Sequence, residues 1–227
     1  MQAVILAAGR GTRLKPISDR YSKAMVPVLG RPLADRVLET LVVNGVHDVV
    51  MVIGEEDLEI RDHFTTKTTL DITARFVVQE KRLGMAHALG LAAGLIHGPF
   101  VLSACDSIKD VEHVGELLRE AAAADGALSL LDVPWDLVSK SAPVELDGKF
   151  VRRIVEKPPV RDAPSNTVSL PLYALPHELL DALKDLELSA RGEYELQGAI
   201  QAVIDAGAKI VGVRAKERHQ VSTPQEL

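Results

Sequence analysis

The chain has 227 residues, of which 47% are hydrophobic, and its formal net charge is −6 at pH 7. These values suit one large α/β domain with a sizeable core. The negative charge disfavours a nucleic-acid binder. No apolar run reaches the roughly 18 residues of a membrane-spanning helix. Cys105 is the only cysteine, which excludes an intramolecular disulfide and favours a cytoplasmic location.

Short apolar runs alternate with helical patterns through the first part of the chain. The start of the chain has no basic leader and is expected to be a strand rather than a targeting signal. The apolar runs are residues 3–7, 49–53, 72–78, 100–104 and 127–133. Their continuous Val, Ile and Leu content is typical of strands buried on both faces of a parallel sheet.

Helical patterns lie between these runs. They cover residues 33–41, 85–96 and 114–121. This alternation predicts right-handed crossovers and a doubly wound sheet. After about residue 135 the order changes, with a hairpin around Asp147-Gly148, a strand at 168–175, helices at 177–186 and 194–206 and a last strand at 209–213. We expect these later elements to extend the same sheet with antiparallel strands.

A glycine- and arginine-rich loop follows the first apolar run. It reads Leu6-Ala7-Ala8-Gly9-Arg10-Gly11-Thr12-Arg13-Leu14-Lys15-Pro16, and Lys23 lies beyond it. Ligands of open parallel sheets bind outside the carboxyl ends of strands, and Gly9 and Gly11 let the backbone approach a ligand closely. Arg13 offers phosphate oxygens a planar fork and Lys23 a compact charge. The loop therefore predicts a polyphosphate site.

Two familiar phosphate-binding loops do not fit this sequence. A P-loop needs four residues between its glycines, then Gly-Lys-Ser or Gly-Lys-Thr, and that spacing is absent. The dinucleotide fingerprint needs a third glycine where Leu14 stands, and no acidic residue follows a second strand at the usual distance.

The loop instead resembles the signature of the sugar-1-phosphate nucleotidylyltransferases, or NDP-sugar pyrophosphorylases. The resemblance continues through Lys23-Ala24-Met25-Val26-Pro27-Val28 and Gly30-Arg31-Pro32. Within the family, the sequence is similar to the glucose-1-phosphate thymidylyl- and uridylyltransferase branch in particular. It implies a Rossmann-like nucleotidyltransferase fold, with three α/β/α layers around a mostly parallel mixed sheet. The expected domain is residues 1–227, with a nucleotide-binding half at 1–135 and an acceptor-binding half at 136–227.

The resemblance also implies a reaction. A nucleoside triphosphate, with UTP or dTTP favoured, would be joined to a sugar 1-phosphate, releasing pyrophosphate, by in-line attack on the α-phosphorus assisted by Mg²⁺. Two alternatives stay open: a regulatory domain that binds a nucleotide or sugar phosphate without turnover, and cytidylyl transfer to a polyol phosphate. The sequence also leaves open a homo-oligomer.

Individual residues take expected roles from the resemblance. Arg13 matches the arginine that holds the triphosphate, and Lys23 matches the lysine at the reacting phosphates. Asp106 follows a buried strand, where a carboxylate can hold Mg²⁺ against phosphates; these three are the expected catalytic residues. Gln79 and Gly84 match a pair that reads uracil or thymine. The expected nucleotide-binding set is Leu6, Ala8, Gly9, Gly11, Thr12, Arg13, Gln79 and Gly84.

The acceptor side resembles the family less closely. Glu156-Lys157-Pro158 matches the family's Glu-Lys-Pro, whose first two residues meet the sugar and its phosphate, and Asn166 and Glu193 fall where the family places further sugar-side groups. Gln220 stands where the family has a second metal-binding aspartate. The expected metal ligands are therefore Asp106 and Gln220, with fewer charges than usual for Mg²⁺.

Overall fold

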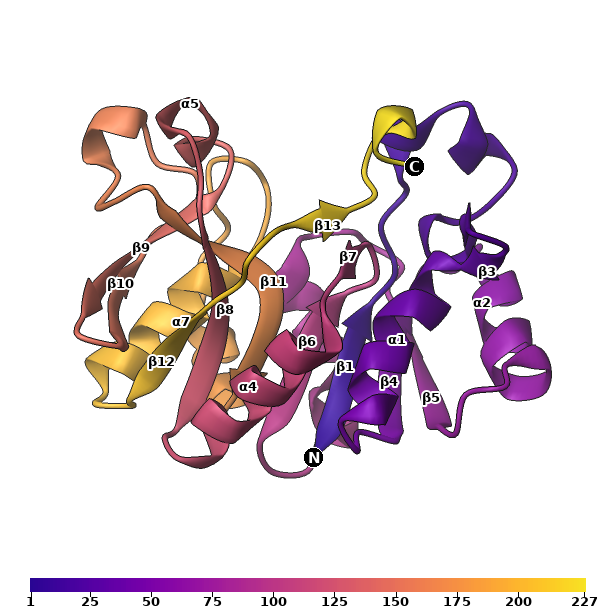
Figure 1. Cartoon of the computed structure of the whole chain (residues 1–227), viewed down its shortest axis with the longest axis horizontal. Coiled ribbons are helices and arrows are strands. Elements are labelled where there is room, and N and C mark those ends of the chain that lie inside the picture. Colours follow the sequence, from indigo (N-terminus) through magenta and orange to yellow (C-terminus); the bar gives the residue numbers. More distant parts are fainter.

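The computed structural model describes the whole chain, residues 1–227, built around one nine-stranded sheet with the order β5-β4-β1-β6-β11-β8-β12-β10-β9 (Figure 1). The strands of this sheet are β1 (Gln2–Leu6), β4 (Asp48–Ile53), β5 (Thr73–Val78), β6 (Phe100–Ala104), β8 (Gly126–Asp132), β9 (Ala142–Asp147), β10 (Phe150–Ile154), β11 (Thr167–Leu175) and β12 (Ile210–Arg214). Two short pairs stand outside it, β2 (Pro27–Val28) with β3 (Arg31–Pro32), and β7 (Ser107–Ile108) with β13 (His219–Gln220).

Helices cover both faces of the sheet, as the three-layer prediction requires. They are α1 (Leu33–Val43), α2 (Leu58–Asp62), α3 (Met85–Ala92), α4 (Val111–Ala122), α5 (Trp135–Val138), α6 (Leu179–Ala182) and α7 (Leu196–Asp205). Because side chains of a strand alternate between faces, Ala3 and Ile5 of β1 pack in one core with α1 and α4, whereas Val4 packs in the other with α3 and α7.

The sheet is mixed in the way expected from the sequence. Strand β1 pairs in parallel with β4 and β6, and β4 pairs in parallel with β5. The hairpin predicted around Asp147-Gly148 is confirmed as β9 and β10. Strand β11 runs antiparallel between β6 and β8, so these two predicted strands are not neighbours. The continuous sheet joins the first part of the chain to the second.

The C-terminal segment returns to the N-terminal loop. Strand β13 pairs with β7 directly after Asp106, and Val221 packs in a small core with Leu14, Val26 and Leu33. Figure 1 shows this yellow segment beside the indigo loop that follows β1. The N-terminal loop and the C-terminal segment therefore meet near the carboxyl ends of β1 and β6. No helix of the chain has the length and apolar character needed to traverse a bilayer.

Candidate active site

A cavity of about 300 Å³ lies at the carboxyl ends of β1, β5 and β6. Its lining residues are Leu6, Ala8, Gly9, Lys23, Gln79, Arg82, Gly84, Met85, Ala88, Ala104, Cys105, Asp106 and Glu193. The structure thus gathers expected residues of the phosphate loop, the base-reading pair and the metal site around one space. Burial raises the pKa of the Cys105 thiol to about 12, so the thiol is protonated at neutral pH, and Cys105 packs in a core cluster.

Asp106 is the centre of the polar network in this cavity. It is only 6% exposed, and its Oδ2 accepts hydrogen bonds from Lys23 Nζ, from Gln220 Nε2 at 3.0 Å and from Ser222 Oγ at 3.1 Å. Burial opposes ionisation, but the Lys23 ammonium and these hydrogen bonds outweigh it and hold the pKa of Asp106 below its ordinary value. The side chain is therefore a carboxylate at neutral pH.

The carboxylate of Asp106 fits one ligand position of a divalent cation. Its Oδ1 accepts no hydrogen bond from the chain, and magnesium commonly takes one or two protein carboxylates while keeping several waters. Gln220 is used differently. Its Nε2 faces Asp106 and its Oε1 accepts from Arg218, so both ends of the amide are engaged within the protein. The role of Gln220 as a metal ligand stays a prediction.

The phosphate loop is shaped by its glycines and fixed by an arginine. Gly11 has φ +60°, and a Cβ there would lie 3.2 Å from Lys23 Cβ, so the loop and Lys23 are in close contact. Arg82 Nε donates to the carbonyl of Ala8 at 2.5 Å, and its guanidinium also pairs with Glu56. Sequence reasoning missed Arg82, because nothing in its local sequence indicates a contact 74 residues away.

Gly11, Thr12 and Arg13 of the expected nucleotide-binding set do not line the 300 Å³ cavity. Thr12 lines a separate polar cavity together with Arg10 and Glu56. Arg13 is exposed and lines a neighbouring cavity of about 660 Å³, together with Arg218 and Gln220. Gln220 thus lies between the space that Arg13 faces and the buried carboxylate of Asp106.

Gln79 and Gly84, the residues expected to recognise the base, lie in contact with each other. Gln79 follows β5 and is 4% exposed. Its Nε2 lies 3.3 Å from the carbonyl oxygen of Gly84 and 2.9 Å from Nδ1 of His87. Gly84 has φ +98°, and a Cβ at this position would lie 2.7 Å from the carbonyl oxygen of Tyr194. Only glycine fits this turn into α3.

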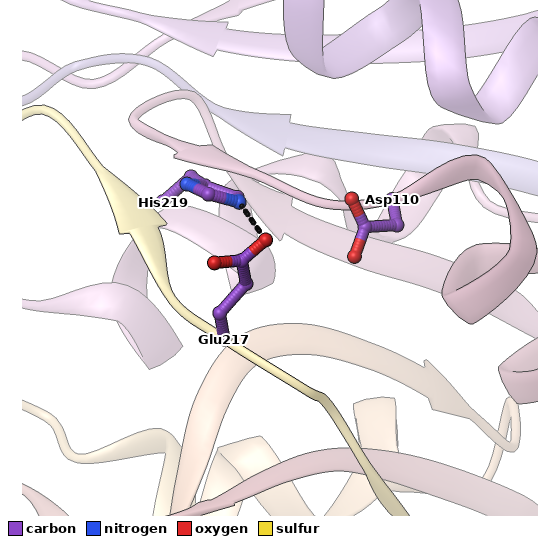
Figure 2. A group of neighbouring side chains, drawn as sticks. All are labelled: Asp110, Glu217 and His219. Carbon is purple, nitrogen blue, oxygen red and sulfur yellow. Dashed lines mark ion pairs between the residues drawn. The ribbon is translucent and has the colours of Figure 1, made fainter.

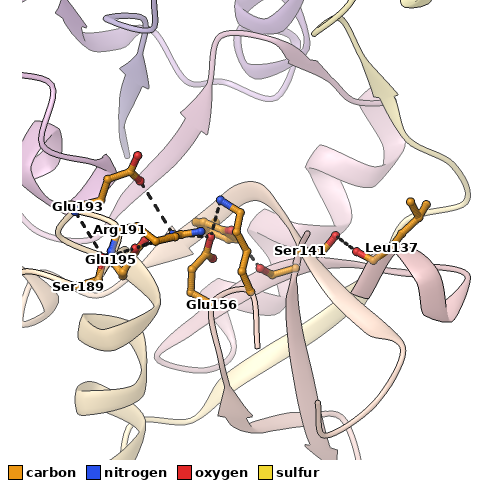
Figure 3. Close-up of polar contacts among 10 residues, drawn as sticks. Leu137, Ser141, Glu156, Ser189, Arg191, Glu193 and Glu195 are labelled. Atoms are coloured by element: carbon orange, nitrogen blue, oxygen red, sulfur yellow. Dashed lines mark hydrogen bonds and ion pairs between the residues drawn. The ribbon is translucent and has the colours of Figure 1, made fainter. Parts of the chain in front are cut away.

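The expected acceptor residues meet an arginine that the sequence analysis did not single out. Figure 3 shows Arg191 among the carboxylates of Glu156, Glu193 and Glu195. Its Nη2 lies 3.2 Å from Glu156 Oε1 and 2.5 Å from Glu195 Oε1, and 4.0 Å from Glu193 Oε2. Lys157 also pairs with Glu156, at 3.1 Å.

The acceptor residues are spread more widely than the nucleotide residues. Of the expected four, only Glu193 lines the 300 Å³ cavity, and Glu156, Lys157 and Asn166 do not. The amide of Asn166 donates to the carbonyl of Val133 at 3.0 Å, so its nitrogen supports the end of β8.

Comparison with known proteins decides the family. The family model described as "Nucleotidyl transferase" matches residues 2–218. The chain belongs to the nucleotidyl transferase family. This match confirms the resemblance recognised in the glycine- and arginine-rich loop.

Curated relatives and solved structures agree with this family. The bifunctional protein GlmU of Methanococcus maripaludis is 32% identical over 218 residues, covering 95% of this chain and 50% of the relative. The UTP–glucose-1-phosphate uridylyltransferase AglF of Haloferax volcanii is 32% identical over 217 residues, covering 94% and 88%. A UDP-glucose pyrophosphorylase structure from Acinetobacter baumannii has a TM-score of 0.85 at 21% identity, covering 99% and 90%. The chain spans about half the length of the GlmU relatives, and the structural match confirms the nucleotidyltransferase fold.

Outside the cavity, the chain has a group of three side chains of types that can bind a metal ion. Figure 2 shows Asp110, Glu217 and His219 facing one another, with ligand atoms within 4.8 Å. All three side chains are exposed, and His219 Nε2 already pairs with Glu217 Oε1 at 2.9 Å. The three residues therefore form an exposed polar cluster at β13.

Lys109 is a buried cation near the site. It is 5% exposed, it forms no ion pair, and its Nζ donates to Ser107 Oγ at 2.6 Å. Burial, and secondly the charge of Arg218, lower the pKa of Lys109 to about 8. Below that pH the folded protein holds a charged ammonium at a cost in stability.

Replacing Lys109 with methionine is expected to stabilise the folded protein at pH 7 by about 2 kcal/mol. The pKa difference converts at about 1.4 kcal/mol per unit, and the lost hydrogen bond to Ser107 offsets part of this gain. Lysine has a pKa of 10.5 when unperturbed. Between pH values of about 8 and 10.5 the unfolded chain therefore binds more protons than the folded protein. The cost therefore disappears as pH rises from about 8 to 10.5. Urea unfolding of both proteins across this pH range measures the difference in their free energies of unfolding. A difference that does not change with pH would contradict the lowered pKa of Lys109.

Proposed function

We propose that this nucleotidyl transferase joins a nucleoside triphosphate, with UTP or dTTP favoured, to a sugar 1-phosphate and releases pyrophosphate. The observation that carries the proposal is the contact between Lys23 and Asp106, in a cavity that Gly9 of the phosphate loop and Gln79 also line. A mobile ammonium, a carboxylate, close backbone amides and a base-reading amide are the groups that nucleotidyl transfer requires.

The proposed reaction is attack of an acceptor phosphate oxygen on the α-phosphorus, with pyrophosphate leaving in line. Lys23 would turn from Asp106 to the phosphates and stabilise the charge that develops on them. Arg13, which lines the 660 Å³ cavity, would hold the β- and γ-phosphates through its planar fork. Asp106 would hold Mg²⁺, which neutralises phosphate charge when bound.

The two parts of the chain would divide the substrates. Residues 1–135 supply the phosphate loop, Lys23, Gln79 and Asp106 for the nucleotide. Residues 136–227 would bind the acceptor through Glu156, Lys157, Asn166 and Glu193. The relative from Haloferax volcanii, named as acting on glucose 1-phosphate, supports a hexose 1-phosphate as the first acceptor to test. We also propose that the protein works in the cytoplasm, where its single buried cysteine, Cys105, stays reduced.

The test is turnover with defined substrates. The protein is incubated with each nucleoside triphosphate, Mg²⁺, pyrophosphatase and a panel of sugar 1-phosphates, and phosphate release is followed. We expect release with UTP or dTTP and a hexose 1-phosphate. Preference for CTP with a polyol phosphate would establish cytidylyl transfer instead. Silence across the whole panel, polyol phosphates included, would contradict transferase activity.

Gln220 gives specific support to a second candidate, nucleotide binding without turnover. An amide in place of the family's carboxylate lowers the negative charge available for a cation beside Asp106. Calorimetry that detects UTP binding, together with no product from any acceptor, would establish this function. The variant Gln220→Asp then identifies the cause, because a gain of turnover would locate the defect in the missing carboxylate.

A further inference from the structure

The orientation of the Gln79 side-chain amide is fixed by its two neighbours. Its Nε2 faces the carbonyl oxygen of Gly84 at 3.3 Å, and a carbonyl oxygen only accepts hydrogen bonds, so the atom facing it is the NH₂ group. The same Nε2 lies 2.9 Å from Nδ1 of His87. An NH₂ group donates there, so His87 Nδ1 carries a lone pair and its proton is on Nε2.

The other end of the amide faces the cavity. Gln79 Oε1 accepts no hydrogen bond from the chain, yet it is not among the buried side-chain atoms that lack a partner. Since Gln79 lines the 300 Å³ cavity, its accessible oxygen is the atom offered to a ligand. Both hydrogens of the Gln79 NH₂ group have acceptors within the protein. This side chain therefore offers a ligand in the cavity a hydrogen-bond acceptor and no donor.

Pyrimidine bases differ at the atom that such an oxygen would meet. Uracil and thymine carry a hydrogen on N3, which can be donated to a carbonyl oxygen, whereas N3 of cytosine is a bare acceptor. An oxygen of Gln79 facing N3 of cytosine would leave two acceptors opposed and unpaired in a closed site, which costs far more than one hydrogen bond gains.

We propose that His87 is a positioning residue that sets base selectivity by holding the Gln79 amide with its oxygen toward the cavity. The inference rests on the proposed function, since it concerns the base of the same nucleotide. His87 is half-buried on α3 and its ring stacks on Tyr194, with centroids 6.4 Å apart and planes inclined by 21°. Tyr194 in turn donates its amide to Leu83 and accepts from Ala86, so the segment at 193–194 holds the ring in place.

Two substitutions separate the acceptor at Nδ1 from the ring itself. In His87→Asn the side-chain oxygen can occupy the place of Nδ1 and accept from Gln79, whereas His87→Leu has no acceptor. Both variants lose the contact with Tyr194, so a purely structural effect would appear equally in both. The readout is selectivity for UTP over CTP, measured as the ratio of kcat/KM values and, separately, as the ratio of Kd values from calorimetry.

We expect the selectivity ratio of His87→Leu to fall about tenfold or more, because the amide loses one of its two orienting partners and its flipped form becomes populated. His87→Asn is expected to stay within about threefold of the unmodified protein. Equal losses in the two variants, or an unchanged ratio in the leucine variant, would overturn the proposal. If His87→Leu does not fold, His87→Ala replaces it in the same comparison.

Binding to the unmodified protein gives an independent measurement. UTP methylated at N3 is expected to bind about tenfold more weakly than UTP, or worse, since the hydrogen donated to Gln79 is gone. Equal affinity for the two nucleotides would contradict the orientation of Gln79. Failure of the proposed transferase activity would appear as silence with every acceptor, whereas the Kd ratios would still test His87.

Discussion

Replacing Lys23 with alanine is expected to lower kcat/KM about a hundredfold or more, which corresponds to about 2.7 kcal/mol of transition-state stabilisation. Lys23 Nζ contacts Asp106 Oδ2 and lies 3.5 Å from Ser222 Oγ, and its side chain is only 12% exposed. A buried charge in such a site acts at low dielectric on the developing phosphate charge. Steady-state kinetics with UTP and the acceptor found in the panel measure the loss.

The matched control is another lysine that also pairs with an aspartate. Lys67 forms an ion pair with Asp62, but its side chain is 65% exposed, so water screens the charge. Lys67→Ala is therefore expected to leave kcat/KM within about twofold of the original value. A loss below about fivefold in Lys23→Ala would place Lys23 away from the reacting phosphates.

The elements of the fold could be predicted from the sequence because their signals are local. The runs at 3–7 and 49–53 are fully apolar and the run at 100–104 is apolar except for Ser103, which is typical of strands covered on both faces, and the structure buries them between two helical layers. The position of β11 between β6 and β8 could not be predicted, since the run 168–175 does not encode which strands it joins. The pairing of His219 and Gln220 with β7 was also missed, because two-residue strands have no periodicity to detect.

The site divides in the same way. Lys23, Gln79 and Asp106 could be predicted as site residues because they belong to strings with fixed spacing, and the structure places all three around one cavity. Arg82, Arg191 and Ser222 were missed because each acts over a long sequence distance, such as the 116 residues between Ser222 and Asp106. A polar residue of an irregular loop carries no local signal of such a partner. The orientation of Gln79 depends likewise on His87, eight residues further along.

Replacing Asp106 with asparagine is expected to lower kcat by about 100- to 1000-fold, the range seen when one preorganised charged or polar group is removed from an active site. Asparagine keeps the shape but removes the charge that faces Lys23 and that would hold a cation. The same change should destabilise the fold by about 3 kcal/mol at pH 7, because it leaves a buried ammonium without its counter-charge. Kinetics and thermal unfolding of the two proteins measure these effects.

The pH dependence of this destabilisation identifies its origin. The pKa of Asp106 is lowered in the folded state from its ordinary value of 3.8, so the carboxylate stabilises the fold fully above that value, and the contribution is lost as pH falls through the lowered pKa. The unfolding difference between the original protein and Asp106→Asn should therefore be constant near neutrality and shrink below about pH 4. Asp62→Asn, at the exposed pair with Lys67, should show little difference in stability from the original protein at any pH.

Because Lys23 and Asp106 act as one unit, the double variant Lys23→Ala/Asp106→Asn should lose much less activity than the product of the two single losses. Single losses that simply multiply in the double variant would show that the two side chains do not cooperate.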